Sequence, residues 1–202
     1  MKVIGLTGGI GSGKSAVAAI LRDKYKAVIL DTDSIAKRQM EPGGESYNLV
    51  LEYFGNEILA PDGKIDRQKL AKIIFEDKSK RLKINELTHP VVLEEVKKEI
   101  EDRTKAGDTN YLVVETALMI EAGYDYICDE ILYVYAPEEI RRNRLKESRG
   151  YTDEKIDSIM ANQSKDKEFR ARYKKVIENT GDISYLEKQI DQLLKEDMAS
   201  SV

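Results

Sequence analysis

Residues 1–16 read Met1-Lys-Val-Ile-Gly-Leu-Thr-Gly8-Gly9-Ile10-Gly11-Ser12-Gly13-Lys14-Ser15-Ala16, and this stretch decides the fold. It begins as a short apolar run typical of a strand and ends in a helix-like pattern that continues through Leu21. Between the two, residues 8–15 match G-x-x-x-x-G-K-[ST], the phosphate loop of nucleotide-binding proteins. Because the match lies at a strand-to-helix junction, as the motif requires, we expect a polyphosphate to bind here.

Each residue type in this loop has a physical task. Glycine lacks Cβ, so the backbone can take positive φ and bring several N–H groups close to phosphate oxygens. The positive end of the following helix points at the same anion. Lys14 adds a charge that reaches the β- and γ-phosphates, and the Ser15 hydroxyl is a ligand for Mg²⁺.

Length and composition fit an ordinary enzyme domain. A chain of 202 residues is long enough for one sizeable core with a small appended subdomain. The net charge of −4 implies no general affinity for nucleic acid or membrane. Cys128 is the only cysteine, so no internal disulfide or cysteine metal cluster can form. No signal sequence fits and no apolar run approaches the roughly 20 residues of a membrane span, so we expect a cytoplasmic protein.

Two carboxylates follow the second apolar run, residues 26–30. Asp31 and Asp33 stand at its carboxyl end, where open α/β sheets place their ligand crevice. The alternative is that Asp33 or Ser34 caps the helix predicted over residues 35–40. The phosphate loop favours the functional interpretation.

The middle of the chain, residues 41–106, has helical patterns and no strong strand. A tight turn is expected within residues 59–65, and Pro90 predicts a helix boundary near His89. The segment is typical of a substrate-covering insertion between the second and third strands. His89 is the only histidine; such a residue is more often a polar surface or capping group than a catalytic one.

Charged residues also follow the third and fourth strands, predicted over residues 111–114 and 130–135. Glu115 is placed to orient Mg²⁺ directly or through water, and the alternative is an ordinary helix-start carboxylate. After the fourth strand come four arginines, which form either a solvated helix face or a clamp that closes over a triphosphate: Arg141, Arg142, Arg144 and Arg149. A fifth strand over residues 175–179 precedes a terminal helix. Five strands alternating with helices predict an α/β fold with a parallel, doubly wound sheet.

The chain resembles the dephospho-coenzyme A kinase family in pieces that span nearly its whole length, in family order and with near-family spacing. The pieces are Gly5-Leu-Thr-Gly-Gly-Ile-Gly-Ser-Gly-Lys-Ser15, Asp31-Thr-Asp33, Pro42-Gly43, Phe54-Gly55, Asp62-Gly63-Lys-Ile-Asp66-Arg67, Ile74-Phe75, His89-Pro90, Leu118-Met-Ile-Glu121, Arg144-Leu145, Gln163 and Asn179-Thr-Gly181. Since many activities share the phosphate loop, the other pieces give the resemblance its specificity.

The resemblance implies a P-loop NTPase fold of the nucleoside-monophosphate-kinase type, with a five-stranded parallel sheet, a helical acceptor-binding insertion and a lid. It divides the single kinase domain into a core (residues 1–40, 107–140 and 174–202), the insertion (41–106) and the lid (141–173). It also implies transfer of the ATP γ-phosphoryl group to the ribose 3′-hydroxyl of dephospho-coenzyme A, with ATP and Mg²⁺ as cofactors. Dephospho-coenzyme A is then the partner, with no nucleic acid or membrane.

The resemblance further implies roles for individual residues. Lys14, Asp33 and Arg144 are expected to be catalytic, with Asp33 as general base and Arg144 clamping phosphates from the lid side. The residues expected to bind ATP are Gly9, Gly11, Ser12, Gly13, Lys14, Ser15, Ala16 and Asn179. The acceptor is expected to contact Asp33, His89 and Glu121, and the expected metal ligands are Ser15 and Glu115.

Two positions depart from the family pattern. The family usually has Pro-Leu-Leu-Phe-Glu where this chain has Ala117-Leu-Met-Ile-Glu121, which loses a rigid proline. Ser148-Arg149 replaces the Arg-Asp pair that usually follows Arg144-Leu145, which shifts a lid arginine by one position.

Two other functions remain alternatives. One is a nucleoside or nucleotide kinase of the same fold, which differs in its acceptor pocket. The other is a nucleotide-dependent switch or binding module of the GTPase type. That class expects an Asn-Lys-x-Asp segment, which the sequence lacks.

Overall fold

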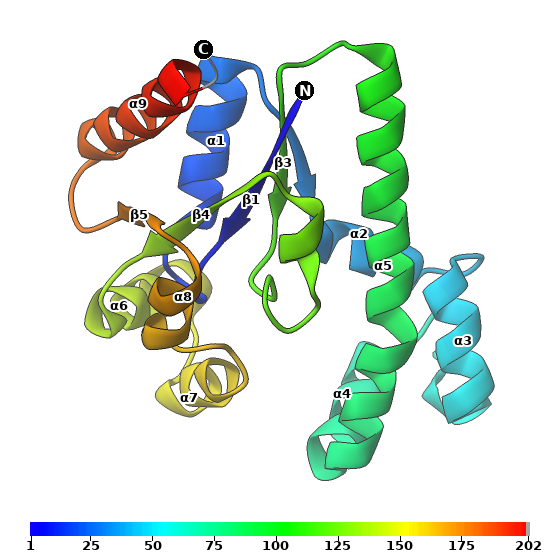
Figure 1. Cartoon of the computed structure of the whole chain (residues 1–202). Helices are drawn as coiled ribbons and strands as arrows, with labels where there is room; N and C mark the ends of the chain where they lie inside the picture. The colour runs from blue at the N-terminus through cyan, green and yellow to red at the C-terminus, as the bar shows by residue number, and fades with distance from the viewer. Residues whose placement is uncertain (201–202) are drawn as a thin grey trace. The chain divides into compact units, whose positions relative to one another are not determined.

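The computed structural model describes residues 1–200 and contains a five-stranded parallel sheet in the order β2-β3-β1-β4-β5 (Figure 1). Each strand predicted from the sequence is present, with end points that differ by one or two residues in most cases. The strands are β1 (Lys2–Thr7), β2 (Val28–Asp31), β3 (Tyr111–Glu115), β4 (Glu130–Tyr135) and β5 (Lys175–Glu178).

Helices connect the strands. The α-helices are α1 (Lys14–Tyr25), α2 (Thr32–Gln39), α3 (Glu45–Phe54), α4 (Arg67–Glu76), α5 (Lys78–Ala106), α6 (Glu138–Arg149), α7 (Asp153–Ala161), α8 (Asp166–Arg172) and α9 (Ile183–Ser200). Short 3-10 helices lie at η1 (Asn56–Ile58) and η2 (Tyr124–Ile127). No helix within residues 1–200 combines the length and the apolar composition that crossing a bilayer requires.

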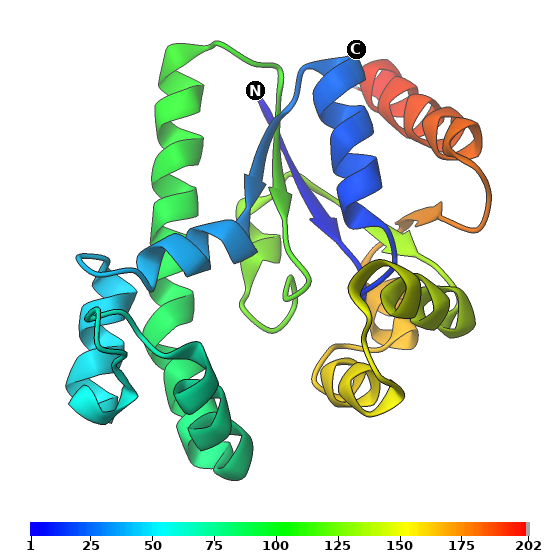
Figure 2. The same ribbon diagram turned by 180° about the vertical axis from the view of Figure 1, so that it is seen from behind.

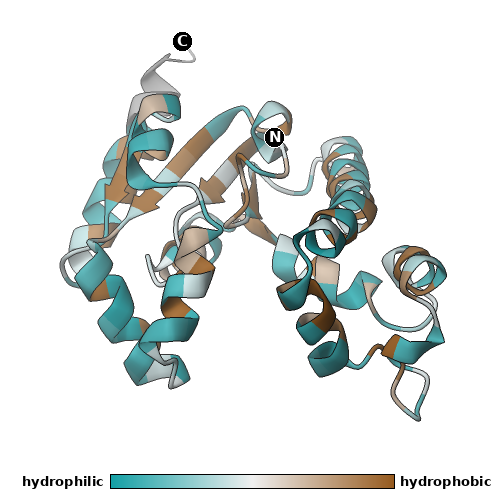
Figure 3. Ribbon diagram, turned by 90° about the horizontal axis from the view of Figure 1, so that it is seen from below, coloured by the Kyte–Doolittle hydropathy of each residue, from teal (hydrophilic) through white to brown (hydrophobic). Residues whose placement is uncertain are grey.

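The chain forms two compact units, one comprising Met1–Leu30 with the chain from Arg103 onward and the other Asp31–Asp102. In the first unit, α1 and α9 lie side by side and pack on one face of the sheet (Figures 1 and 2). Alternate strand residues such as Ile4, Leu6 and Val134 point into this core, because side chains alternate between the faces of a strand. Figure 3 shows the strands as mostly hydrophobic.

The opposite face of this sheet has its own packing. Tyr133 stacks on Phe169 of α8 with ring centroids 4.7 Å apart. Gly5 lies against Met119 and Ile131, where a Cβ at residue 5 would come within 2.7 Å and 2.4 Å of their terminal carbons. This close packing covers part of the second face of the sheet at the inner strands β1 and β4.

The second unit is helical, with a separate apolar core. Val50, Phe54, Ile58, Ile65 and Leu70 are buried together. The tight turn expected within residues 59–65 is confirmed, since the Gly63 N–H donates to the Ala60 carbonyl and Ala60 N–H to Lys64. The functional division into an insertion over residues 41–106 and a lid over 141–173 stays a prediction.

One sequence prediction about this region is wrong. Pro90 was expected to end a helix near His89, but α5 runs without interruption from Lys78 to Ala106. Proline removes one backbone N–H, yet the burial of Val91, Val92 and Val96 stabilises the turns that follow it. The Thr88 hydroxyl also donates to the Ile84 carbonyl at 2.8 Å, one turn before the proline.

Candidate active site

The phosphate loop lies between β1 and α1, as the motif predicts. Gly8, Gly11 and Gly13 all have positive φ, and Gly13 caps α1 in the left-handed conformation with φ 95°. The Lys14 ammonium donates to the Gly8 carbonyl at 2.8 Å, across the loop. The loop therefore holds the curved backbone and the positive charge that an anion-binding site needs.

The two predicted metal ligands lie together. The Ser15 hydroxyl donates to Glu115 Oε1 at 3.2 Å, although the two residues are 100 positions apart in the sequence. A hydroxyl and a carboxylate are the hard oxygen ligands that Mg²⁺ accepts, with phosphates and water completing its shell. Among the side chains described for residues 1–195, no group of three or more His, Cys, Asp and Glu is suited to a metal ion. The residues present thus fit a cation held jointly with a bound phosphate.

Asn179 and Arg144 lie against the other end of the loop. Buried Asn179 donates through Nδ2 to the Ser12 carbonyl at 2.7 Å. Arg144 donates to the same carbonyl at 3.4 Å and to Asn179 Oδ1 at 3.3 Å. A Cβ on Gly13 would lie 2.0 Å from Asn179 Nδ2, so only glycine permits this approach. Together these contacts fix the loop just before Lys14, Ser15 and Ala16.

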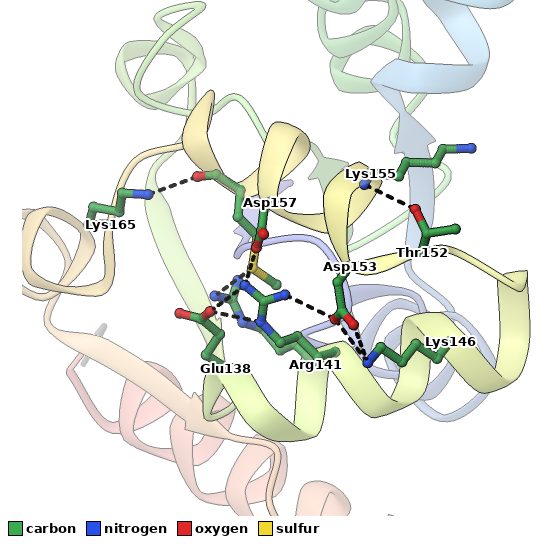
Figure 4. A network of polar contacts seen from close by, with 10 residues as sticks. Glu138, Arg141, Lys146, Thr152, Asp153, Lys155, Asp157 and Lys165 are labelled. Carbon is green, nitrogen blue, oxygen red and sulfur yellow. Dashed lines mark hydrogen bonds and ion pairs between the residues drawn. The ribbon is translucent and has the colours of Figure 1, made fainter.

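Two of the other arginines after β4, Arg142 and Arg149, make contacts away from the phosphate loop. Arg142 binds Glu138 at 2.9 Å, Asp153 at 3.4 Å and also Asp157, and its hydrogen bonds to Asp157 and Glu138 raise the pKa of its guanidinium. Figure 4 shows the surrounding network, in which Lys146 also binds Asp153. These pairs join α6 to α7. Arg149 is exposed and lies 6.0 Å from the Tyr151 ring.

The fourth arginine, Arg141, lies against the phosphate loop. A Cβ on Gly9 would be 1.9 Å from its Nη1 atom. Among the four arginines after β4, Arg141 and Arg144 therefore face the loop, whereas Arg142 and Arg149 do not.

The connection between α7 and α8 contacts two loops of the sheet. Gln163 Oε1 accepts a hydrogen bond from the Ile10 N–H at 2.9 Å. Glu121 Oε1 accepts from both the N–H and the hydroxyl of Ser164 at 2.8 Å. Gln163 is among the pieces shared with the family but has no role predicted from the sequence, and Ser164 was not predicted at all, because neither belongs to a local motif with a known chemistry.

The contacts after β2 show which residue caps α2. Asp31 is the cap of α2, since its carboxylate accepts from the Asp33 N–H at 3.1 Å and from the Ser34 hydroxyl at 2.5 Å. The capping role considered for Asp33 or Ser34 thus belongs to Asp31. The Asp33 carboxylate is exposed and makes no hydrogen bond or ion pair within the described residues. His89 is half-buried on α5, in the same unit as Asp33.

Burial suppresses ionisation of Cys128, just before β4, and of Tyr133 on β4. Burial, with smaller effects from Asp129 and Asp125, raises the pKa of the Cys128 thiol to about 12. Burial and the hydrogen bond to Asp166 raise the pKa of Tyr133. Cys128 is therefore a protonated thiol at neutral pH and is unsuited to act as a nucleophile.

Comparisons with known proteins agree on one family. A family model for dephospho-CoA kinase matches residues 2–184. A dephospho-CoA kinase from Lactobacillus johnsonii is 40% identical over 195 residues, covering 96% of each chain. A Thermus thermophilus protein of known structure has a TM-score of 0.81 and 31% identity, covering 96% of this chain and 97% of its own. Shikimate kinase from Acinetobacter baumannii shares the fold alone, with a TM-score of 0.56 and 18% identity over 98% of this chain and 94% of its own.

The parallel sheet and the phosphate loop, together with the matching family model and the 40% identical relative, define a P-loop kinase, a phosphotransferase enzyme. Within that class, the chain belongs to the dephospho-CoA kinase family. Its function is accordingly the ATP-dependent phosphorylation of dephospho-CoA in coenzyme A biosynthesis.

Proposed function

We propose that the enzyme transfers the γ-phosphoryl group of ATP to the ribose 3′-hydroxyl of dephospho-CoA, giving CoA and ADP. The observation that carries this proposal is the phosphate loop itself, with Lys14 held 2.8 Å from the Gly8 carbonyl. Family membership supplies the acceptor.

Positioning and charge neutralisation do most of the work, because phosphoryl transfer asks little covalent chemistry of a protein. The loop amides and Lys14 hold the β- and γ-phosphates, and Arg144 adds positive charge from α6. A bond forms from the acceptor oxygen to the γ-phosphorus while the bond from that phosphorus to the β–γ bridging oxygen breaks. The electron pair of the broken bond leaves with ADP.

Asp33 is the general base of the proposal. It takes the proton of the 3′-hydroxyl as the new bond forms. Its exposed carboxylate, which makes no hydrogen bond or ion pair with the side chains described for residues 1–195 or with the backbone, supports this role because none of these donors competes for it. Asp31 instead caps α2 and so fixes the backbone from which Asp33 projects.

Ser15 and Glu115 are the proposed ligands of Mg²⁺, which when bound would neutralise negative charge on the phosphates. Their 3.2 Å contact supports this assignment. The remaining roles follow the family: Gly9 and Gly11 to Ala16 with Asn179 for ATP, and His89 and Glu121 for the acceptor. Glu121 uses Oε1 for Ser164, which leaves Oε2 for a ligand.

A cytoplasmic location and a purely small-molecule set of partners belong to the same proposal. A lone cysteine fits a reducing compartment, since no disulfide depends on an oxidising one.

The test is an acceptor panel. Purified protein is incubated with Mg-ATP and either dephospho-CoA, AMP, CMP or adenosine, and the products are separated by chromatography. We expect CoA and ADP in equal amounts from dephospho-CoA only, and no turnover in EDTA. If only another acceptor were phosphorylated, the assignment of the substrate would be wrong and the assignment as a kinase would stand. Preferential GTP binding with no acceptor phosphorylated would instead favour a nucleotide switch.

A further inference from the structure

Arg141 packs directly on the glycines of the phosphate loop. A Cβ on Gly9 would lie 1.9 Å from Arg141 Nη1, and a Cβ on Gly11 would lie 2.8 Å from the Arg141 carbonyl oxygen. Such distances are far below van der Waals contact, so the guanidinium occupies the space that a side chain at residue 9 would take. The bare backbone of Gly9 is what allows this arginine to approach the loop.

The guanidinium lacks the partners that a desolvated charge needs. Its Nε atom is buried with no hydrogen-bond partner, and Nη2 reaches only Met160 Sδ at 3.9 Å. Within the described residues it pairs with no carboxylate, whereas the neighbouring Arg142 binds Glu138, Asp153 and Asp157. A partly buried charge without a partner is energetically costly. An anion that binds Arg141 removes this cost, so its binding free energy is unusually favourable.

A cavity of about 310 Å³ opens beside this guanidinium. Its lining includes Gly9, Ser12, Arg141, Gln163 and Lys165. The Ser12 hydroxyl is also buried without a hydrogen-bond partner. Two unsatisfied donors thus meet at a wall made partly by the phosphate loop, which is the chemistry that recognises phosphate oxygens. Lys165 donates to the Met160 carbonyl at 2.9 Å, and the two carboxylates in the lining, Glu138 and Asp166, are paired with Arg142 and Arg170.

Gln163 fixes the adjoining backbone. Its Oε1 accepts from the Ile10 N–H at 2.9 Å, and it lies 3.7 Å from the position of a Cβ on Gly9. A glutamine side chain has two more donors on Nε2. Among the side chains that the structure describes, residues 1–195, these donors make no hydrogen bond, so they too are available to an anion at this end of the loop.

We propose that Arg141 is a further catalytic residue, whose guanidinium binds the phosphate chain of ATP at the Gly9–Ile10 end of the loop, and that Gln163 positions this end. The proposal rests on the kinase function given above and adds a residue to it. An arginine fixed in advance at the transferring group stabilises the charge that develops on its oxygens without reorganisation.

The test compares Arg141→Met with Arg141→Lys and with Arg22→Met, a change at an exposed arginine near the far end of α1 that pairs with its neighbour Asp23. Kinetics give kcat and KM for each substrate, and calorimetry without acceptor gives Kd for ATP and for adenosine. We expect Arg141→Met to lower kcat/KM for ATP by about 10²-fold and to weaken ATP binding, with adenosine affinity unchanged. Arg141→Lys should recover part of the loss, and Arg22→Met should match the unmodified enzyme.

Gln163→Met tests the positioning role. It should lower kcat about tenfold with adenosine affinity unchanged, and the Arg141→Met/Gln163→Met double variant should lose less than the product of the two single losses, because both act on one end of the loop. If the loss of kcat in the double variant equalled the product of the two single losses, Gln163 would have no part in the proposal.

Two results would overturn the role of Arg141. One is a kcat/KM for ATP in Arg141→Met within about threefold of the unmodified enzyme. The other is an equal loss of ATP and adenosine affinity with a lowered melting temperature, which would mark a structural residue. Failure of the acceptor assignment is separate: the unmodified enzyme would then make no CoA, yet Arg141→Met would still lose ATP binding selectively.

Discussion

At the scale of single residues, phosphate binding by the loop depends both on a charged side chain, at Lys14, and on the lack of a side chain, at Gly13. Lys14 supplies charge, and its 2.8 Å contact with the Gly8 carbonyl holds that charge over the loop. Gly13 supplies a left-handed turn that a side chain would strain, and it lets Asn179 reach the Ser12 carbonyl. A substitution of Lys14 would therefore weaken phosphate binding by removing charge, whereas a substitution of Gly13 would weaken it by straining the backbone.

Lys14→Ala removes the charge and leaves the backbone turn intact. We expect kcat/KM for ATP to fall by about 10²-fold or more, in line with the loss of one preorganised contact to developing charge. Steady-state kinetics with dephospho-CoA as acceptor measure the effect. Lys24→Ala on the same helix is the control, because Lys24 binds Asp191 on the surface. Near-normal turnover of Lys14→Ala would contradict the loop's catalytic assignment.

At the scale of elements, α5 shows packing overriding a local signal. Proline disfavours a helix interior by about 3 kcal/mol relative to alanine. The helix nevertheless continues through Pro90, because buried valines on the following turns hold it. Its sequence alone carries both signals and does not say which one prevails.

Pro90→Ala should therefore stabilise the protein. We expect the free energy of unfolding to rise by about 1–3 kcal/mol, since alanine restores a backbone donor and removes the ring clash. Chemical denaturation measures the change. Pro61→Ala is the matched control with the opposite sign, because Pro61 occupies the second position of the turn closed by the Gly63 N–H and the Ala60 carbonyl. That change should cost about 0.5–1 kcal/mol. A stability of Pro90→Ala at or below that of the unmodified protein would show that the proline is accommodated without cost.

At the scale of the whole molecule, the proposed roles divide between the two compact units. The phosphate loop, Glu115, Arg141 and Asn179 belong to the unit that contains the sheet, and Asp33 belongs to the helical unit. We therefore expect nucleotide binding and proton transfer to be separable, so that a substitution can remove one and keep the other.

This separation gives a prediction for ligand-induced stability. Mg-ATP at about 100 times its Kd stabilises a folded protein by about 2.7 kcal/mol, or roughly 5–10 °C in melting temperature for a chain of this size. Asp33→Asn should keep this shift in a thermal melt and yet lose phosphoryl transfer. Lys14→Ala should lose most of the shift. An unchanged kcat in Asp33→Asn would remove Asp33 from the base role.

The sequence by itself determined the features that depend on near neighbours. The phosphate loop, the order of strands and helices and the turn at residues 60–63 all follow from local residue types and their spacing. The pieces shared with the kinase family also identified the reaction, because they span most of the chain.

Only the tertiary structure decided which distant side chains meet. Ile10 and Gln163 are 153 residues apart, and their hydrogen bond exists because the α7–α8 connection packs on the loop. The spacing of the arginines likewise could not predict the different contacts of the adjacent residues Arg141 and Arg142. Arg141 contacts Gly9, whereas Arg142 binds three carboxylates. Local patterns set the elements, whereas the direction in which each side chain points, and the charge it finds there, is fixed only when those elements pack.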